Sequence, residues 1–296
     1  MKRSLKKEYY RDQIAARDEM VREYESTLDT AIQIKDGPNG KIILANLTNM
    51  TVLGGRLKIQ EDLYGLTPNP NQHLPLNRPD MLNVPHSVNT FDAGKALERR
   101  IKWFMIGTGG ENLSVPFSTY KPKNYETKLY NEVPFRCVPL NADLTETEAA
   151  SYRLRKPITI ANDQYWAYYA KVMTVDSLDL TFNENNYVPL IADTTPVQKN
   201  DTSHRLSGGK VIAVSRFTLT ITETEFKEWY RLKNNGLLDG ARLSELGLIF
   251  GLDTPNSLVN GRLEVADAEM AAKLTHSPVP MDEEGSSRVV EYRIYT

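Results

Sequence analysis

Apolar and polar side chains alternate most regularly in the C-terminal half of the chain, and this alternation predicts β-strands. The clearest case is residues 210–222, where Phe217, Leu219 and Ile221 alternate with threonines, because successive side chains of a strand face opposite sides of a sheet. Further strands are predicted at residues 41–47, 101–106, 133–139, 158–160, 166–172, 178–182, 243–250 and 288–296. The pattern predicts a mainly β (α+β) fold with an antiparallel β-sandwich-like core.

The N-terminal segment has a different pattern. Residues 4 to about 30 lack proline and glycine, and their glutamates, arginines and alanines favour a helix. We therefore predict an N-terminal helical arm over residues 1–35. Two interpretations of its thin apolar stripe remain open: a peripheral helix on its own domain, or an arm that packs on a neighbouring subunit through a heptad seam. The candidate contact residues are Tyr10, Ile14, Val21, Tyr24 and Leu28.

Residues 36–100 are predicted to form an extended strap with short strands. Residues 36–40 read Asp-Gly-Pro-Asn-Gly, which is typical of a turn. Residues 51–59 could pair with the strand at 41–47 or form a loop. Five prolines lie between residues 65 and 85, so regular secondary structure is not expected there.

The core is predicted over residues 101–296, with a long insertion at about 141–207. Its central strand, residues 101–106, ends at Gly107, Gly109 and Gly110, whose backbone freedom lets a loop leave the sheet. That loop carries Tyr120 and Tyr125, which we predict to belong to a contact surface.

Short helices are predicted at residues 146–152 and 223–233. Thr145 and Thr222 stand directly before them, and threonine is a favourable N-cap residue. Residues 262–272 fit a helix or a strand equally.

Composition and motifs offer little support for catalysis or for charged partners. The formal net charge is −2, which gives no electrostatic reason to expect nucleic acid, and no apolar run is long enough to span a bilayer. The single cysteine, Cys137, is interpreted as a small buried residue. The four histidines are far apart, and the glycine-rich segments lack the phosphate-loop pattern. We therefore predict no catalytic residue, no cofactor, no metal site and no enzymatic activity.

Several segments, taken in their order, carry a family resemblance. The run Lys-Trp-Phe-Met-Ile-Gly-Thr-Gly-Gly at residues 102–110 is followed by Lys-Leu-Tyr-Asn-Glu-Val-Pro-Phe-Arg at 128–136. Later come the alternating strand at 217–223, Leu-Ser-Glu-Leu-Gly-Leu at 243–248 and the closing strand at 289–295. This order resembles that of tail and collar-fibre-like proteins of tailed bacteriophages. The long insertion, the segment 262–280, the helix and the strap depart from it.

The resemblance implies a β-sandwich-like virion protein. It leads us to expect a non-enzymatic neck, collar, tail or baseplate component, assembled in the host cytoplasm, which forms a ring or bridges neighbouring subunits. Its partners would be other virion proteins and copies of itself, without nucleic acid or membrane. One alternative is a receptor- or carbohydrate-binding module of a fibre attachment, with Trp166, Tyr168 and Tyr169 in an exposed groove. The strand period instead favours alternate members of that run in the core. A cell-wall hydrolase is a further alternative.

Overall fold

A computed structural model describes residues 29–47, 50–64, 69–76, 98–111, 119–182, 211–222, 224–255, 262–282 and 287–295. The predicted contact residues of the arm lie outside these ranges: Tyr10, Ile14, Val21, Tyr24 and Leu28. Most of the predicted helix, residues 77–97 of the predicted strap and residues 183–207 of the predicted insertion also lie outside them.

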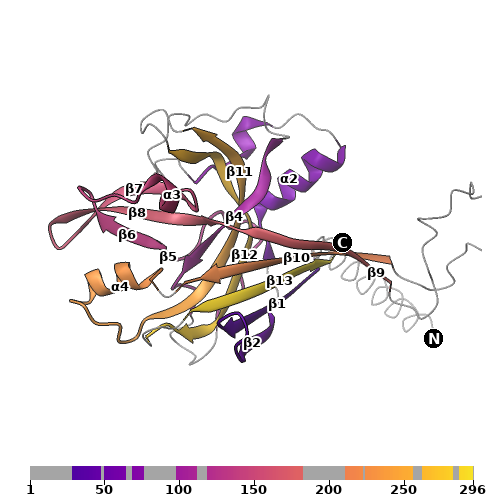
Figure 1. The fold of residues 1–296 in the computed structure, drawn as a ribbon. Helices are drawn as coiled ribbons and strands as arrows, with labels where there is room; N and C mark the ends of the chain where they lie inside the picture. Colours follow the sequence, from indigo (N-terminus) through magenta and orange to yellow (C-terminus); the bar gives the residue numbers. More distant parts are fainter. Residues whose placement is uncertain are drawn as a thin grey trace, which may run out of the picture. The chain divides into compact units, whose positions relative to one another are not determined.

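Most of the described chain is β-structure, as Figure 1 shows. The first elements are β1 (Asp29–Asp36), β2 (Ile42–Leu47), β3 (Met50–Thr51), α2 (Leu53–Tyr64), the 3-10 helix η1 (Pro70–Gln72) and β4 (Arg100–Gly107). They are followed by β5 (Glu132–Val133), β6 (Arg136–Pro139), α3 (Glu146–Ala149), β7 (Tyr152–Ile160), β8 (Asp163–Val172) and β9 (Thr174–Phe182). The last are β10 (Val211–Ile221), α4 (Lys227–Lys233), β11 (Arg242–Pro255), β12 (Leu263–Pro280) and β13 (Arg288–Tyr295).

The strands form two sheets. A five-stranded sheet has the order β2-β1-β13-β10-β9, and an eight-stranded sheet contains the path β3-β12-β11-β4-β8-β6, with β5 paired to β4 and β7 paired to β8. The long β11 and β12 are antiparallel over most of their length. The prediction of a mainly β fold with antiparallel sheets is confirmed.

The predicted central strand is also confirmed. β4 lies between β11 and β8, with Phe104 opposite Leu248 on one side and Trp103 opposite Val172 on the other. The side chains of Trp103 and Met105 are about 1% exposed. They belong to a core cluster with Val52, Ile249 and other apolar residues.

The described chain divides into two compact units. One consists of Ala31–Thr174 and Thr218–Tyr292 and holds the core described here. The other consists of Met1–Thr30, Val175–Phe217 and Arg293–Thr296, of which the structure describes residues 29–30, 175–182, 211–217 and 293–295.

Three predicted boundaries are wrong. The helical arm was predicted to run to residue 35, but residues 29–36 form strand β1, which pairs with β2 across the predicted turn at Gly37. The strap contains the helix α2, where a strand or loop was expected. The predicted insertion begins at residue 141, yet β7 and β8 belong to the eight-stranded sheet.

Helix α2 was missed because Gly54 and Gly55 look like a break in the sequence. In the fold they let the helix approach β12 closely. A Cβ on Gly55 would lie 2.1 Å from the carbonyl oxygen of Ala271, and one on Gly54 would lie 2.7 Å from that of Met270. Glycine normally weakens a helix interior. It is needed here because any larger residue would collide with the backbone of β12.

The predicted caps have different outcomes. Thr145 caps α3 with a capping box, in which its side chain accepts from the Glu148 N–H and the Glu148 carboxylate accepts from the Thr145 N–H. Thr222 does not cap α4, because that helix begins only after Phe226.

Residues 262–272, which fitted a helix or a strand equally, lie almost entirely in strand β12.

Candidate interaction surface

The described part of the loop after β4 presents three exposed tyrosines. Tyr120, Tyr125 and Tyr130 are 52%, 64% and 46% exposed. They lie within residues 119–131, which we call the tyrosine loop. The structure thus places the predicted Tyr120 and Tyr125 on one surface segment and adds Tyr130, which sequence reasoning had not selected.

Backbone contacts fix the start of the tyrosine loop. The Tyr120 N–H donates to the Gly110 carbonyl at 2.7 Å, and its own carbonyl accepts from the Thr275 hydroxyl at 2.5 Å. An isolated antiparallel bridge joins Glu111 to Thr119. Gly110 has φ +78°, a conformation that side chains disfavour. The loop therefore leaves β4 at a position set by glycine.

The end of the loop is held by Glu245 on β11, whose side chain is fully buried. Its carboxylate accepts hydrogen bonds from three backbone N–H groups, those of Gly109 at 2.9 Å, Tyr130 at 2.8 Å and Asn131 at 3.0 Å. Hydrogen bonds to a charged acceptor are stronger than neutral ones. One carboxylate thus joins the exit from β4 to the end of the tyrosine loop.

The glycines of the predicted exit make room for this carboxylate. A Cβ on Gly109 would lie 2.6 Å from Glu245 Oε2 and 2.8 Å from the Asn131 nitrogen. A Cβ on Gly107 would lie 2.7 Å from the same carboxylate oxygen and from the Asn131 carbonyl. These two glycines are therefore needed for close approach.

Lys273 on β12 balances the charge of Glu245. Its ammonium is fully buried and lies 3.4 Å from Glu245 Oε1 and 2.9 Å from Glu126 Oε2. It also donates to the Lys128 carbonyl at 3.2 Å and lies 3.1 Å from the ring centroid of Tyr130. A cation over a tyrosine ring is attracted to its negative face. Lys273 thus contacts the tyrosine loop through the Glu126 carboxylate, the Lys128 carbonyl and the Tyr130 ring.

Tyr130 keeps its hydroxyl proton in this setting. Burial, together with the hydrogen bond that the hydroxyl donates to Glu126, raises the pKa of Tyr130 well above its usual value. The hydroxyl is therefore a donor at neutral pH. Lys123 lies in the same loop and is exposed. Its pKa is raised because of Tyr125, and its ammonium lies 5.6 Å from the ring centroid of Tyr125.

His276 follows the loop-binding Thr275 on β12 and is 2% exposed. Its Nδ1 lies 2.8 Å from the Ser277 carbonyl, whereas Nε2 has no hydrogen-bond partner among the described residues. The neutral ring with a proton on Nδ1 fits this arrangement. Burial lowers the pKa of His276 to about 4.

A pH dependence of stability follows from His276. Its ordinary pKa of about 6.5 applies to the unfolded chain, so between about pH 6.5 and 4 the unfolded state takes up a proton that the folded state does not. The contribution of His276 to stability should fall through this window, by about 3 kcal/mol. Urea unfolding at pH 7.5, 6, 5 and 4.5 measures this loss, and the His276→Asn variant should show less of it. Equal pH profiles for the two proteins would contradict the prediction.

Two other sequence interpretations can now be judged. Cys137 is 4% exposed, as predicted, and burial raises the pKa of its thiol to about 12. Tyr168 and Tyr169 are both buried, and Trp166 is half-buried with the Arg155 guanidinium 3.9 Å from its ring centroid. The carbohydrate-binding alternative predicted an exposed aromatic groove at these residues, and that prediction is wrong. The prediction that alternate residues of this run lie in the core is also wrong, since residues 167–170 are all buried.

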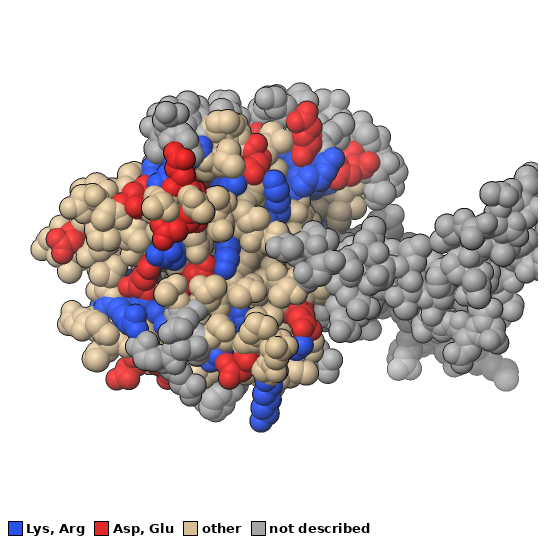
Figure 2. Space-filling model, viewed as in Figure 1, with Lys and Arg blue, Asp and Glu red and all other residues tan. Residues whose placement is uncertain are grey.

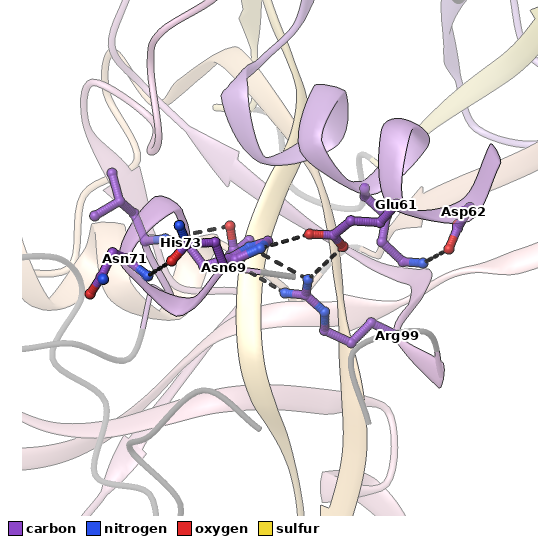
Figure 3. A network of polar contacts seen from close by, with 9 residues as sticks. Glu61, Asp62, Asn69, Asn71, His73 and Arg99 are labelled. Carbon is purple, nitrogen blue, oxygen red and sulfur yellow. Dashed lines mark hydrogen bonds and ion pairs between the residues drawn. The ribbon is translucent and has the colours of Figure 1, made fainter. Parts of the chain in front are cut away.

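A second polar cluster lies wholly inside the fold, between α2, β12 and the segments that flank them. Figure 3 shows Glu61, His73 and Arg99 pointing toward one another. His73 has Nδ1 2.8 Å from a Glu269 oxygen and Nε2 2.8 Å from a Glu61 oxygen. Arg99 donates to Glu269 at 2.7 Å and to Glu61 at 3.2 Å. We call these four residues the buried quartet.

The four side chains of the buried quartet face one another. Both ring nitrogens of His73 lie within hydrogen-bond distance of carboxylate oxygens, and the Arg99 guanidinium donates to both carboxylates. The side chains of His73 and Arg99 are fully buried and those of Glu61 and Glu269 nearly so. The quartet is thus closed to a substrate and joins α2 and residues 69–76 to the sheet.

No group of three or more histidine, cysteine, aspartate or glutamate side chains in the described ranges is arranged to hold a metal ion. Among the same residues, no helix combines the length and apolar character needed to cross a membrane.

Comparison with known proteins identifies a family. A family of unknown function (DUF7208) matches residues 41–264, most of the chain. The protein belongs to this family. No curated protein and no solved structure matches the chain at a significant level.

Proposed function

We propose that the protein is a non-enzymatic structural component of a tailed-phage virion, which contacts copies of itself and other virion proteins through the tyrosine loop. The observation that carries the contact role is the fixed exposure of Tyr120, Tyr125 and Tyr130 on a loop tied to the sheet. Tyrosine offers a large contact area with a polar end, and interfaces are enriched in it. A loop that is already ordered loses little entropy on binding.

The virion assignment is supported by the resemblance in segment order, and the fold shows that three of its segments form one unit. Gly109 belongs to the first, Tyr130 and Asn131 belong to the second, and Glu245 belongs to the Ser-Glu-Leu-Gly-Leu segment. All meet at the Glu245 carboxylate. In this fold the order of the segments has a physical role, because each segment supplies part of the support for the tyrosine loop.

The proposed location is the neck, collar, tail or baseplate of the particle, after assembly in the host cytoplasm. A ring requires each subunit to bind the next through two different surfaces. The tyrosine loop is our candidate for one of them. The N-terminal segment with Tyr10, Ile14, Val21, Tyr24 and Leu28 is the candidate for the other.

The test replaces Tyr120 and Tyr125 together by serine. Both side chains are more than half exposed, so we expect the free energy of unfolding to change by less than about 1 kcal/mol. Self-association measured by sedimentation should weaken at least tenfold, as expected when interface anchors are removed. The matched control is Leu237→Ser, which removes an apolar side chain that is 60% exposed outside the loop.

Antibodies against the chain provide the second measurement. They should label phage particles released by cells that express the protein, and particles formed with the double variant should carry less label. A stable monomer that is also missing from particles would contradict the proposal.

A further inference from the structure

A pocket lies at the tip of the β7–β8 hairpin. Its volume is about 660 Å³, which is within the range of roughly 300–1,000 Å³ typical of small-molecule sites. We call it the tip pocket. It is lined by Pro139, Leu140, Asn141, Asn162, Asp163, Gln164 and Tyr165.

Backbone pairing forms the walls of the tip pocket without any ligand. Tyr165 on β8 lies opposite Pro139 of β6 and Ile158 of β7. The Leu140 N–H donates to the Gln164 carbonyl at 3.0 Å, which holds the end of β6 against β8. The backbone around the pocket is therefore supported by three neighbouring strands of one sheet.

The turn of the hairpin is fixed in the same way. Ala161 and Asn162 connect β7 to β8, with φ of 49° and 75°. Positive φ at both central residues is the geometry of the tight hairpin turn that matches the twist of paired strands. Asn162 and Asp163, which line the pocket, lie at this turn.

The lining is rich in groups that both donate and accept hydrogen bonds. Asn141, Asn162 and Gln164 each carry an amide with two N–H donors and a carbonyl acceptor. Asp163 adds a carboxylate that only accepts, and Tyr165 adds a ring with a hydroxyl. A sugar presents neighbouring hydroxyls, which also both donate and accept, on a ring with apolar C–H faces. The two sets of groups are complementary.

The charge of the tip pocket disfavours an anionic ligand. Its lining contains one carboxylate and no lysine, arginine or histidine. In Figure 2 the end of the molecule where the β7–β8 hairpin turns in Figure 1 is mainly uncharged. A phosphate or an acidic sugar would face Asp163 without a positive partner.

We infer that the tip pocket binds a neutral sugar unit of a glycan, with the amides of Asn141, Asn162 and Gln164 on its hydroxyls. This role is separate from the proposed assembly role and does not rest on it. It places carbohydrate recognition at the hairpin tip, away from the buried Tyr168 and Tyr169.

The experiment applies the full chain to an array of neutral hexoses, N-acetylhexosamines and their oligosaccharides, with sialylated and phosphorylated glycans as anionic probes. The best neutral probe is then titrated by calorimetry or ligand-observed NMR. We expect a Kd in the micromolar to millimolar range, and at least a tenfold weaker Kd for Gln164→Ala and for Asn141→Ala. Both side chains are exposed, so these variants should fold normally.

The matched control is Gln60→Ala, which removes an exposed amide from α2 and should leave the Kd unchanged. The Tyr120→Ser/Tyr125→Ser protein should also bind the sugar normally, and Gln164→Ala should self-associate normally, so the two proposals fail independently. The inference is overturned if no neutral probe binds, if anionic probes bind more tightly, or if the pocket variants bind as the wild type does.

Discussion

Glu245→Gln is expected to lower the free energy of unfolding by about 1–3 kcal/mol, the cost of leaving a buried hydrogen-bond donor without its acceptor. The glutamine has nearly the same shape, so the loss arises from charge and hydrogen bonding. Three backbone N–H groups point at the two carboxylate oxygens. An amide offers only one acceptor oxygen, and its NH₂ group would face at least one of these donors.

The same substitution removes one of the two carboxylates that face Lys273. Among the described residues, the fully buried ammonium would still contact the Glu126 carboxylate, the Lys128 carbonyl and the Tyr130 ring. Its charge stays paired, so the loss arises mainly at the backbone N–H groups. Because Glu245 holds the end of the tyrosine loop, we expect the loop to loosen in the molecules that remain folded.

Chemical denaturation and hydrogen exchange measure the two effects. The amides of Tyr130 and Asn131 should exchange faster in the variant relative to amides of β4. Glu146→Gln is the matched control, since Glu146 is exposed in the first turn of α3, and it should change stability by less than about 1 kcal/mol. A Glu245→Gln protein with wild-type stability and wild-type exchange would show that the carboxylate does not hold the loop.

The strands could be predicted from sequence where one face of the sheet is apolar. In β10, Phe217, Leu219 and Ile221 are buried and the threonines between them are half-exposed, which is the alternation that the sequence shows. β4 was predictable for another reason, because a run of large apolar residues ends in glycines. In both cases the information lies within a dozen neighbouring residues.

β12 could not be predicted in this way. Residues 264–276 are all buried, yet they include Glu264, Asp267, Glu269 and Lys273. Each of Glu269 and Lys273 is satisfied by a partner more than a hundred residues away, Arg99 in one case and the Lys128 carbonyl in the other. A buried charge looks like a surface position until its partner is known.

Distant partners also explain why only part of the candidate site could be predicted from the sequence. Tyr120 and Tyr125 could be selected because a polar loop with tyrosines follows a strand. Glu245 and Lys273, which hold the loop, carry no local signal beyond a charge inside an apolar segment. That conflict between charge and pattern is the signal that could have been used, since a charge in an otherwise apolar strand calls for a buried partner.

Arg99→Met is expected to destabilise the protein by about 3–5 kcal/mol, through an unbalanced buried charge. Without Arg99, His73 is the one residue among those described that still bridges the carboxylates of Glu61 and Glu269. The interior then gains one net negative charge. Methionine keeps much of the side-chain volume and its contact with the Phe250 ring, over which the guanidinium lies at 4.8 Å. The loss therefore reports on charge more than on packing.

A double-mutant cycle separates the buried quartet from a general effect of the substitution. Glu269→Gln alone should also be destabilising, but Arg99→Met/Glu269→Gln should cost at least about 1 kcal/mol less than the two single losses together, because each change removes the other's unpaired partner. The neighbouring Arg100→Met serves as control, since Arg100 is exposed. Additive losses in the cycle, or equal losses for Arg99→Met and Arg100→Met, would mean that the quartet does not hold α2 and residues 69–76 to β12.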